Sequence, residues 1–126
     1  MLVAIAALLG VGAAVGLRPR DPLTLKPGEV LPTVSIRNSA EEQLVFAKLE
    51  NTVEAYKSVG EHFSPNDPVD GDRNRLYGME ATQCLARLYL AQDQPDLALQ
   101  EFRKLSIAEE EEFQAAGMAG QAVVYA

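Results

Sequence analysis

The sequence predicts an all-α fold, and three observations lead to that prediction. Apolar residues recur at helical spacing through most of the chain after residue 39, and helix-capping patterns precede these runs. Breakers rich in proline and glycine separate them, and no segment alternates apolar and polar residues as a half-buried strand would. Of the 126 residues, about 88 are available to bury a core, which is enough for one small domain.

The first 17 residues, MLVAIAALLGVGAAVGL, carry no charge and no proline, and they favour a helix that is apolar on every face. Such a helix is roughly 25 Å long, just under the hydrocarbon core of about 30 Å. Three interpretations stay open: a transmembrane anchor that stops at Arg18 and Arg20, a cleaved signal peptide with a small-x-small site at 14–16, and a buried helix. The first predicts a single-pass membrane protein, with the flanking arginines favouring a cytoplasmic domain. The second predicts a secreted or periplasmic protein.

Residues 18–38 hold four of the seven prolines in the chain, spaced so that no helix can run through them. We expect this stretch to be an extended tether that holds the domain away from the bilayer. The predicted organisation is therefore an anchor or signal segment at 1–17, a tether at 18–38 and a helical domain at 39–126.

Two short helices are predicted to open the domain. Ser39 followed three residues later by Glu42 is a capping-box pattern, which satisfies unpaired amide donors at a helix start. Asn51 and Glu54 repeat the pattern. We expect the first helix to end before Asn51 and the second at the loop 64–71, whose prolines, glycine and aspartates break a helix.

Longer helices are predicted after that loop. Asp72 begins one that ends near Asp93. Pro95 suits the first turn of the next helix, where a missing N–H costs little, and Asp96 complements its positive end. The glutamate run 109–112 lies before or within the first turn of a last helix, and we interpret it as a solvated helix start.

The composition argues against several function classes. The net charge of −7 is concentrated after residue 39, and no basic cluster offsets it, so we expect no nucleic-acid binding. His62 is the only histidine and Cys84 the only cysteine, so we expect no zinc site and no catalytic pair, and we interpret Cys84 as a small core residue. Asp67, Asp70 and Asp72 resemble a calcium loop in composition but lack the spacing of an EF-hand. We expect no catalytic residue, cofactor or metal.

The stretch CLARLYLAQDQPDLALQEFRKL, residues 84–105, predicts an antiparallel helical hairpin. Two helices approach closely only where the side chains at the crossing are small, and we expect Ala86 and Ala98 to lie there. Bulky residues flank the crossing, and each contributes about 1.5 to 3 kcal/mol if fully buried. They are Leu85, Tyr89 and Phe102.

This hairpin resembles the tetratricopeptide repeat (TPR), whose hallmark positions hold Leu, a small residue and Tyr, followed by Ala and Phe. The matching residues are Leu85, Ala86, Tyr89, Ala98 and Phe102. Three positions depart from the family pattern: Thr82 replaces a frequent Trp, Asp93 replaces the turn Gly, and Leu105 replaces the closing Ala.

The family period of about 34 residues places Gly120 at the position of the first small residue. Residues 113–126 thus resemble the first helix of a following repeat. Upstream, residues 39–63 resemble a degenerate hairpin with Ala47 and Ala55 as its small residues.

The resemblance implies a solenoid of antiparallel hairpins that binds a peptide or protein along the face lined by the first helix of each repeat. At the matching positions that face holds Glu80, Gln83, Arg87, Leu90, Met118 and Gln121. The family's clamp for a peptide carboxylate uses Asn and Lys pairs, so we do not expect that mode here. The combination of apolar start, tether and repeats is also similar to bacterial membrane-anchored TPR proteins.

The resulting hypothesis is a non-enzymatic, membrane-tethered scaffold for protein–protein interaction. The alternative is a membrane-proximal accessory segment of a larger multidomain signalling enzyme. Because the last repeat would lack its second helix, Val123, Val124 and Tyr125 are expected to form an apolar face. That face predicts either a longer array or self-association through the C-terminal helix.

Overall fold

The computed structural model describes residues 34–126, and every regular element in that part of the chain is an α-helix. The all-α prediction is therefore confirmed for these residues. The predicted apolar helix at 1–17 and residues 18–33 of the predicted tether lie outside the described residues.

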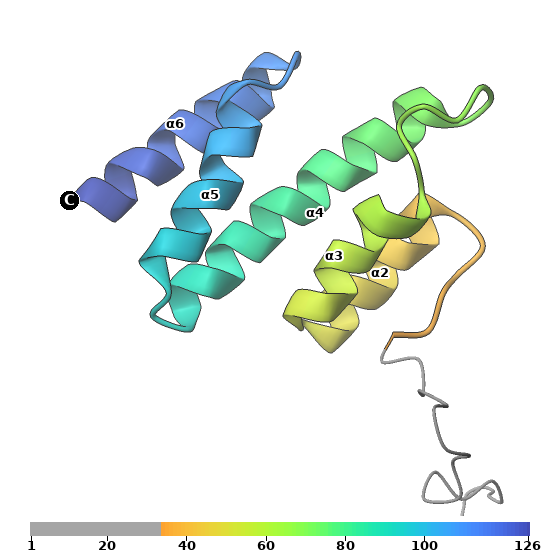
Figure 1. The fold of residues 1–126 in the computed structure, drawn as a ribbon, viewed down its shortest axis with the longest axis horizontal. Helices are drawn as coiled ribbons and strands as arrows, with labels where there is room; N and C mark the ends of the chain where they lie inside the picture. The colour runs from red at the N-terminus through yellow and green to blue at the C-terminus, as the bar shows by residue number, and fades with distance from the viewer. Residues whose placement is uncertain (1–33) are drawn as a thin grey trace, which may run out of the picture. The chain divides into compact units, whose positions relative to one another are not determined.

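Five helices follow one another between residues 34 and 126 (Figure 1). They are α2 (Ala40–Glu50), α3 (Val53–His62), α4 (Gly71–Ala91), α5 (Pro95–Ser106) and α6 (Glu111–Tyr125). Successive helices run antiparallel, and each packs against the next. In addition, α2 contacts α4, and α4 contacts α6. The even-numbered helices therefore lie side by side in one layer, with α4 in the middle.

The start of α2 is capped as predicted. The Ser39 hydroxyl accepts a hydrogen bond from the Glu42 amide at 3.2 Å. The Glu42 carboxylate accepts from the amide of Asn38 at 3.3 Å, one residue earlier than in a standard capping box. Two amide donors at the start of the helix, those of Asn38 and Glu42, are thus satisfied locally.

The link between α2 and α3 differs from the prediction, which placed a second capping box at Asn51. Asn51 instead ends α2 in the left-handed conformation, with φ of 54°, and its amide donates to the Ala47 carbonyl. Thr52 caps α3, because its hydroxyl accepts from the Ala55 amide at 3.2 Å. Asparagine tolerates the left-handed region better than most residues, so it ends one helix and leaves the next residue to begin another.

The loop between α3 and α4 is held by its own polar groups. One carboxylate oxygen of Asp67 accepts hydrogen bonds from the amides of Val69 and Asp70, both at 2.8 Å. These bonds lower the pKa of Asp67 below its ordinary value. The buried Asn74 side chain donates to the Ser64 carbonyl at 2.9 Å. The aspartate-rich loop is therefore a turn that closes onto the start of α4.

Both ends of α4 lie within two residues of their predicted positions. The helix begins at Gly71, where a Cβ atom would lie 2.5 Å from the Pro65 carbonyl oxygen, so only glycine fits without a shift. It ends at Ala91, and the following turn places Asp93 at a φ of 60°. Asp93 thus adopts the left-handed conformation that glycine favours. Pro95 is the first residue of α5, as expected.

The core draws apolar side chains from all five helices. Of the fourteen buried apolar residues in the described part of the chain, ten are alanine, tyrosine or phenylalanine, so small residues bring the helices close while rings fill the space beside them. The buried apolar residues are Ala40, Leu44, Ala47, Ala55, Tyr56, Val59, Ala81, Leu85, Ala86, Tyr89, Ala98, Phe102, Leu105 and Phe113.

A buried glutamine joins the segment before α2 to the helices. Gln43 is fully buried, and its amide group donates to the Ser58 hydroxyl at 2.8 Å and to the Ser35 carbonyl at 3.1 Å. Its carbonyl oxygen accepts from the Arg37 amide at 2.7 Å. The last residues of the predicted tether are therefore hydrogen-bonded to α2 and, through Ser58, linked to α3.

Candidate protein-binding surface

The two alanines that the sequence places at the α4–α5 crossing are fully buried. Ala86 in α4 and Ala98 in α5 each have 0% of their surface exposed, and the two helices pack against each other. Leu85, Tyr89 and Phe102 are all at least 95% buried around them. All five residues that define the predicted hairpin are therefore buried.

Two glycines allow α6 to approach α5. A Cβ atom at Gly120 would lie 2.1 Å from the Phe102 ring. A Cβ atom at Gly117 would lie 2.4 Å from the Ser106 backbone nitrogen and 2.6 Å from the Phe102 carbonyl oxygen. The repeat pattern predicted a small residue at Gly120 but not at Gly117, although the spacing of three residues between them places both on one face of α6.

The four predicted partner-binding residues of α4 share one face of that helix, because their spacing of three or four residues follows the helical turn. Arg87 is exposed, and the other three are half-buried: Glu80, Gln83 and Leu90. Leu90 also packs against the core, so only part of its side chain is available to a partner.

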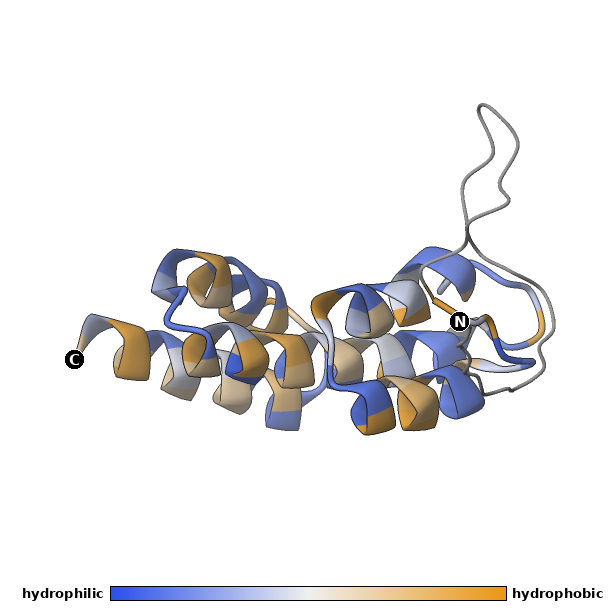
Figure 2. Cartoon of the chain, turned by 90° about the horizontal axis from the view of Figure 1, so that it is seen from below, coloured by the Kyte–Doolittle hydropathy of each residue, from blue (hydrophilic) through white to orange (hydrophobic). Residues whose placement is uncertain are grey.

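The α6 part of the predicted surface is exposed at its centre. Met118 is 59% exposed and Gln121 is half-buried. Val123 and Tyr125 are 61% and 66% exposed, and hydrophobic residues are visible at this end of the ribbon (Figure 2). Val124, in contrast, packs partly against the core, so the apolar face expected at this end holds two of the three predicted residues.

A lysine that the repeat pattern does not predict borders this surface. Lys48 in α2 forms an ion pair with Glu80 in α4, with 2.6 Å between its Nζ and a carboxylate oxygen. The hydrogen bond to Glu80 raises the pKa of Lys48. Both side chains are more than 40% exposed, so the pair contributes at most about 1 kcal/mol. No sequence signal links residues that lie 32 positions apart on different helices.

The single cysteine and the single histidine of the sequence lie on different helices. Cys84 is half-buried in α4 and packs against the edge of the core. Burial raises the pKa of its thiol, which keeps the less nucleophilic protonated form at neutral pH. His62 is the exposed last residue of α3. This arrangement supports the interpretation of Cys84 as a packing residue, although it lies at the edge of the core.

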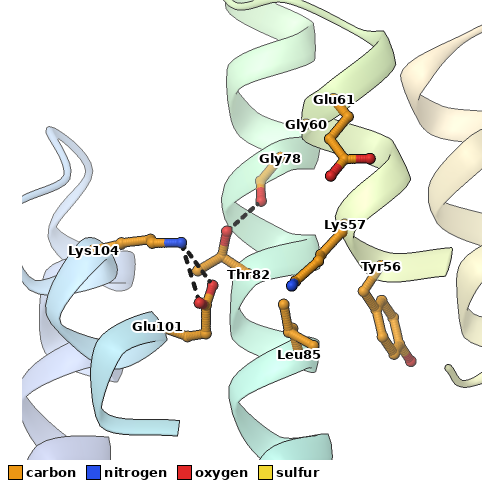
Figure 3. Close-up of a pocket in the computed structure, with 9 residues that line it drawn as sticks. All are labelled: Tyr56, Lys57, Gly60, Glu61, Gly78, Thr82, Leu85, Glu101 and Lys104. Atoms are coloured by element: carbon orange, nitrogen blue, oxygen red, sulfur yellow. Dashed lines mark hydrogen bonds and ion pairs between the residues drawn. The ribbon is translucent and has the colours of Figure 1, made fainter. Parts of the chain in front are cut away.

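A polar groove that the sequence did not predict lies between α3, α4 and α5 (Figure 3). Its volume is about 300 Å³. The nine lining residues are Tyr56, Lys57, Gly60, Glu61, Gly78, Thr82, Leu85, Glu101 and Lys104. Since a Cβ atom at Gly60 or Gly78 would meet nothing within 4 Å, these two glycines leave open space in the groove.

The charged groups of this groove have opposite signs. The nearly buried Glu101 carboxylate accepts two hydrogen bonds from the Lys104 ammonium, at 3.1 and 3.2 Å. Lys57 and Glu61 project from α3 on the other wall (Figure 3). The Thr82 hydroxyl donates to the Gly78 carbonyl at 2.9 Å and is thus already engaged. The groove can take a polar segment, but its two best-placed charges already neutralise each other.

A third surface feature is apolar and lies on the outer side of α2. Val45 and Leu49 are 54% and 81% exposed there, beside Phe46. The Arg37 guanidinium lies 4.5 Å from the centre of the Phe46 ring, a cation–π contact. The even-numbered helices thus carry exposed apolar residues at both ends of the layer.

Comparison with known proteins adds no relative to these observations. No protein-family model matches the sequence, and neither curated proteins nor solved structures yield a match. Among residues 34–126, no helix combines the length and the hydropathy needed to cross a bilayer.

Proposed function

We propose that this chain is a non-enzymatic scaffold of the TPR-like solenoid type, which binds a protein or peptide partner and is tethered to a membrane by its apolar N-terminal segment. One observation carries the proposal. The helices pack in sequence and the even-numbered ones also contact one another, so the hairpins stack in a single direction. Such a stack produces a continuous face from one helix of each hairpin.

The small residues at the contacts support a repeat of the TPR type. Ala86 and Ala98 sit within the α4–α5 hairpin, and Gly120 repeats the position of Ala86 against the Phe102 ring. Equivalent close contacts within one hairpin and between hairpins are what a repeating unit requires. The left-handed conformation of Asp93 further matches the turn that the family usually builds with glycine.

The proposed partner-binding surface consists of Glu80, Gln83, Arg87 and Leu90 of α4 together with Met118 and Gln121 of α6. Arg87 supplies a charge that forms no ion pair within residues 34–126, and Met118 supplies an adaptable apolar side chain. We infer a partner segment with an apolar residue and a carboxylate. The tether would raise the local concentration of the domain at the membrane.

Site-specific photo-crosslinking in native membranes tests this function. A photoreactive amino acid replaces Arg87 or Met118 in the full chain, and the matched control position is Gln100, which is exposed on α5. We expect Arg87 and Met118 to give the same discrete adduct and Gln100 to give none. Identical adducts from all three positions, or none from any, would remove this surface from consideration.

Charge reversal adds a quantitative test on the same surface. With the photoreactive residue at Met118, the substitution Arg87→Glu should lower adduct yield about fivefold, which corresponds to roughly 1 kcal/mol of binding free energy. Because Arg87 is exposed, helical circular dichroism should stay unchanged. An unchanged adduct yield would exclude Arg87 from the contact.

A further inference from the structure

We propose that a second docking site lies at the turn between α5 and α6, and that it takes a basic peptide segment of a partner protein by burying one of its apolar side chains. The site is an apolar pocket of about 390 Å³, which falls in the range of roughly 300 to 1,000 Å³ typical of ligand pockets. Its lining residues are Arg75, Met79, Lys104, Ile107, Ala108, Glu109 and Glu110.

The apolar part of the pocket is already formed in the folded chain. Met79 and Ala108 pack partly against the core, which fixes the floor. Ile107 stands at the rim with 84% of its surface exposed. An aliphatic side chain that is exposed beside an apolar pocket is stabilised when a second apolar group covers both and removes their surface from water. An apolar anchor residue is therefore the first feature of the ligand.

Glu110 supplies the second feature, an unused hydrogen-bond acceptor. One of its carboxylate oxygens, Oε2, accepts from the Arg75 guanidinium. The other, Oε1, is buried and has no hydrogen-bond partner. Glu110 lines the pocket, and a buried acceptor without a partner is unfavourable, so a ligand N–H group that reaches Oε1 removes this unfavourable contribution. A peptide amide next to the anchor residue can supply this donor.

The charge around the pocket defines the third feature. Both cations of the lining are engaged within the described residues, since Arg75 pairs with Glu110 and Lys104 pairs with Glu101. Two further carboxylates lie near Arg75 and form no ion pair within residues 34–126: Glu109, which lines the pocket, and Asp72. This excess of negative charge attracts lysine or arginine side chains on either side of the anchor and repels an acidic segment.

This site is separate from the surface proposed for α4 and α6. It uses Arg75 and Met79 of α4 and the turn after α5, and it shares no residue with the other surface, of which only Glu80 lies in the N-terminal half of α4. Binding at the turn should therefore survive the Arg87→Glu substitution. The two proposals can fail independently.

Fluorescence anisotropy with synthetic peptides and the purified full chain tests the site. The probe is a short labelled peptide with a central leucine pair flanked by lysines. One comparison peptide has serine in place of the leucines, and another has glutamate in place of the lysines. We expect saturable binding of the first probe only, weakened as salt rises because the rim charges are exposed.

Two substitutions of matched exposure locate the binding. Ile107→Ser removes the apolar rim of the pocket, and Val69→Ser removes an aliphatic side chain that is 86% exposed in the loop between α3 and α4. We expect Ile107→Ser to weaken probe binding about tenfold, equal to roughly 1.4 kcal/mol, and Val69→Ser to leave it unchanged. Both positions are exposed, so neither substitution should affect folding, and circular dichroism verifies this.

Three results would each overturn the proposal. Equal binding of the serine peptide would show attraction by net charge alone. Equal loss in the Ile107→Ser and Val69→Ser chains would place the contact elsewhere, and comparable binding of the glutamate peptide would contradict the role of the acidic rim.

Discussion

At the scale of single residues, Gln43 shows how a buried polar side chain can join separate segments. Its side-chain amide forms hydrogen bonds both with the segment before α2 and with Ser58 in the middle of α3. Ser58, which receives one of these bonds, donates its own proton to the Ala55 carbonyl at 2.6 Å. Each polar group of the glutamine thus has a partner, which is the condition under which a buried polar residue does not destabilise a fold.

Replacing Gln43 should therefore weaken the attachment of the segment before α2 and also lower the stability of the helical unit. We expect Gln43→Leu to lower the free energy of unfolding by about 1 to 3 kcal/mol, because three hydrogen bonds are lost at similar side-chain volume. Urea denaturation followed by circular dichroism measures the change. The exposed Gln100→Leu is the matched control and should stay within about 0.5 kcal/mol of the parent chain.

Hydrogen exchange gives the same prediction a local readout. The Arg37 amide donates to Gln43 and should exchange slowly in the parent chain. In the Gln43→Leu chain, the Arg37 amide should exchange at the rate of a solvent-exposed amide without a hydrogen bond. Continued protection of this amide would mean that other contacts hold the segment.

At the scale of the helices, four of the described glycines fall into two groups with opposite roles. Gly117 and Gly120 face α5 at distances that leave no room for a Cβ atom. Gly60 and Gly78 face open space in the groove of Figure 3. A glycine in a helix is less stable than alanine by about 1 kcal/mol. At Gly117 and Gly120, close packing of the two helices offsets this loss. At Gly60 and Gly78, no packing contact offsets it.

This division predicts alanine substitutions of opposite sign. Gly117→Ala should destabilise the chain by about 1 to 3 kcal/mol, because the new methyl group meets backbone atoms that cannot rotate away. Gly60→Ala, also inside a helix, should stabilise it by about 0.4 to 1 kcal/mol. Thermal unfolding of the two variants distinguishes these effects, and a gain in stability for Gly117→Ala would mean that α6 does not approach α5 so closely.

At the scale of the whole described unit, the ion pair between Arg75 and Glu110 joins α4 to the turn before α6, across 35 positions in the sequence. Both side chains are about three-quarters buried. The hydrogen bond from Arg75 lowers the pKa of Glu110 below its ordinary value of 4.5. A carboxylate with a lowered pKa stabilises the fold above its ordinary value and loses that contribution as the pH falls through the lowered one.

The sign of the acid response follows from this shift. Between pH 5 and the lowered pKa of Glu110, stability should decrease in the parent chain, and the decrease should be smaller in Glu110→Gln. Arg75→Met should have a similar effect, since it removes the cause of the shift. In the double variant the pH dependence should match that of either single variant, and an additive change would show that the two residues act separately.

The local sequence alone determined the helical elements of residues 39–126 and the α4–α5 hairpin. Ser39, Pro95 and the loop 64–71 act through the backbone of their nearest neighbours, so their effects can be read along the chain. In the α4–α5 hairpin, small and large residues at helical spacing similarly predicted which side chains are buried. At Asn51 the same local reasoning failed, because its preference for the left-handed region outweighed its capping preference.

The tertiary structure alone decided which distant groups meet. The pairs Lys48–Glu80 and Arg75–Glu110, the bonds of Gln43 and the contact of Gly117 with α5 all join residues on separate elements. The pocket beside Ile107 also arises only where α4 and the turn after α5 come together. The spacing of apolar residues along a helix indicates which of its faces is buried. It does not indicate which other helix covers that face, or in which register the two helices pack. These depend on the packing of all five helices in the described unit.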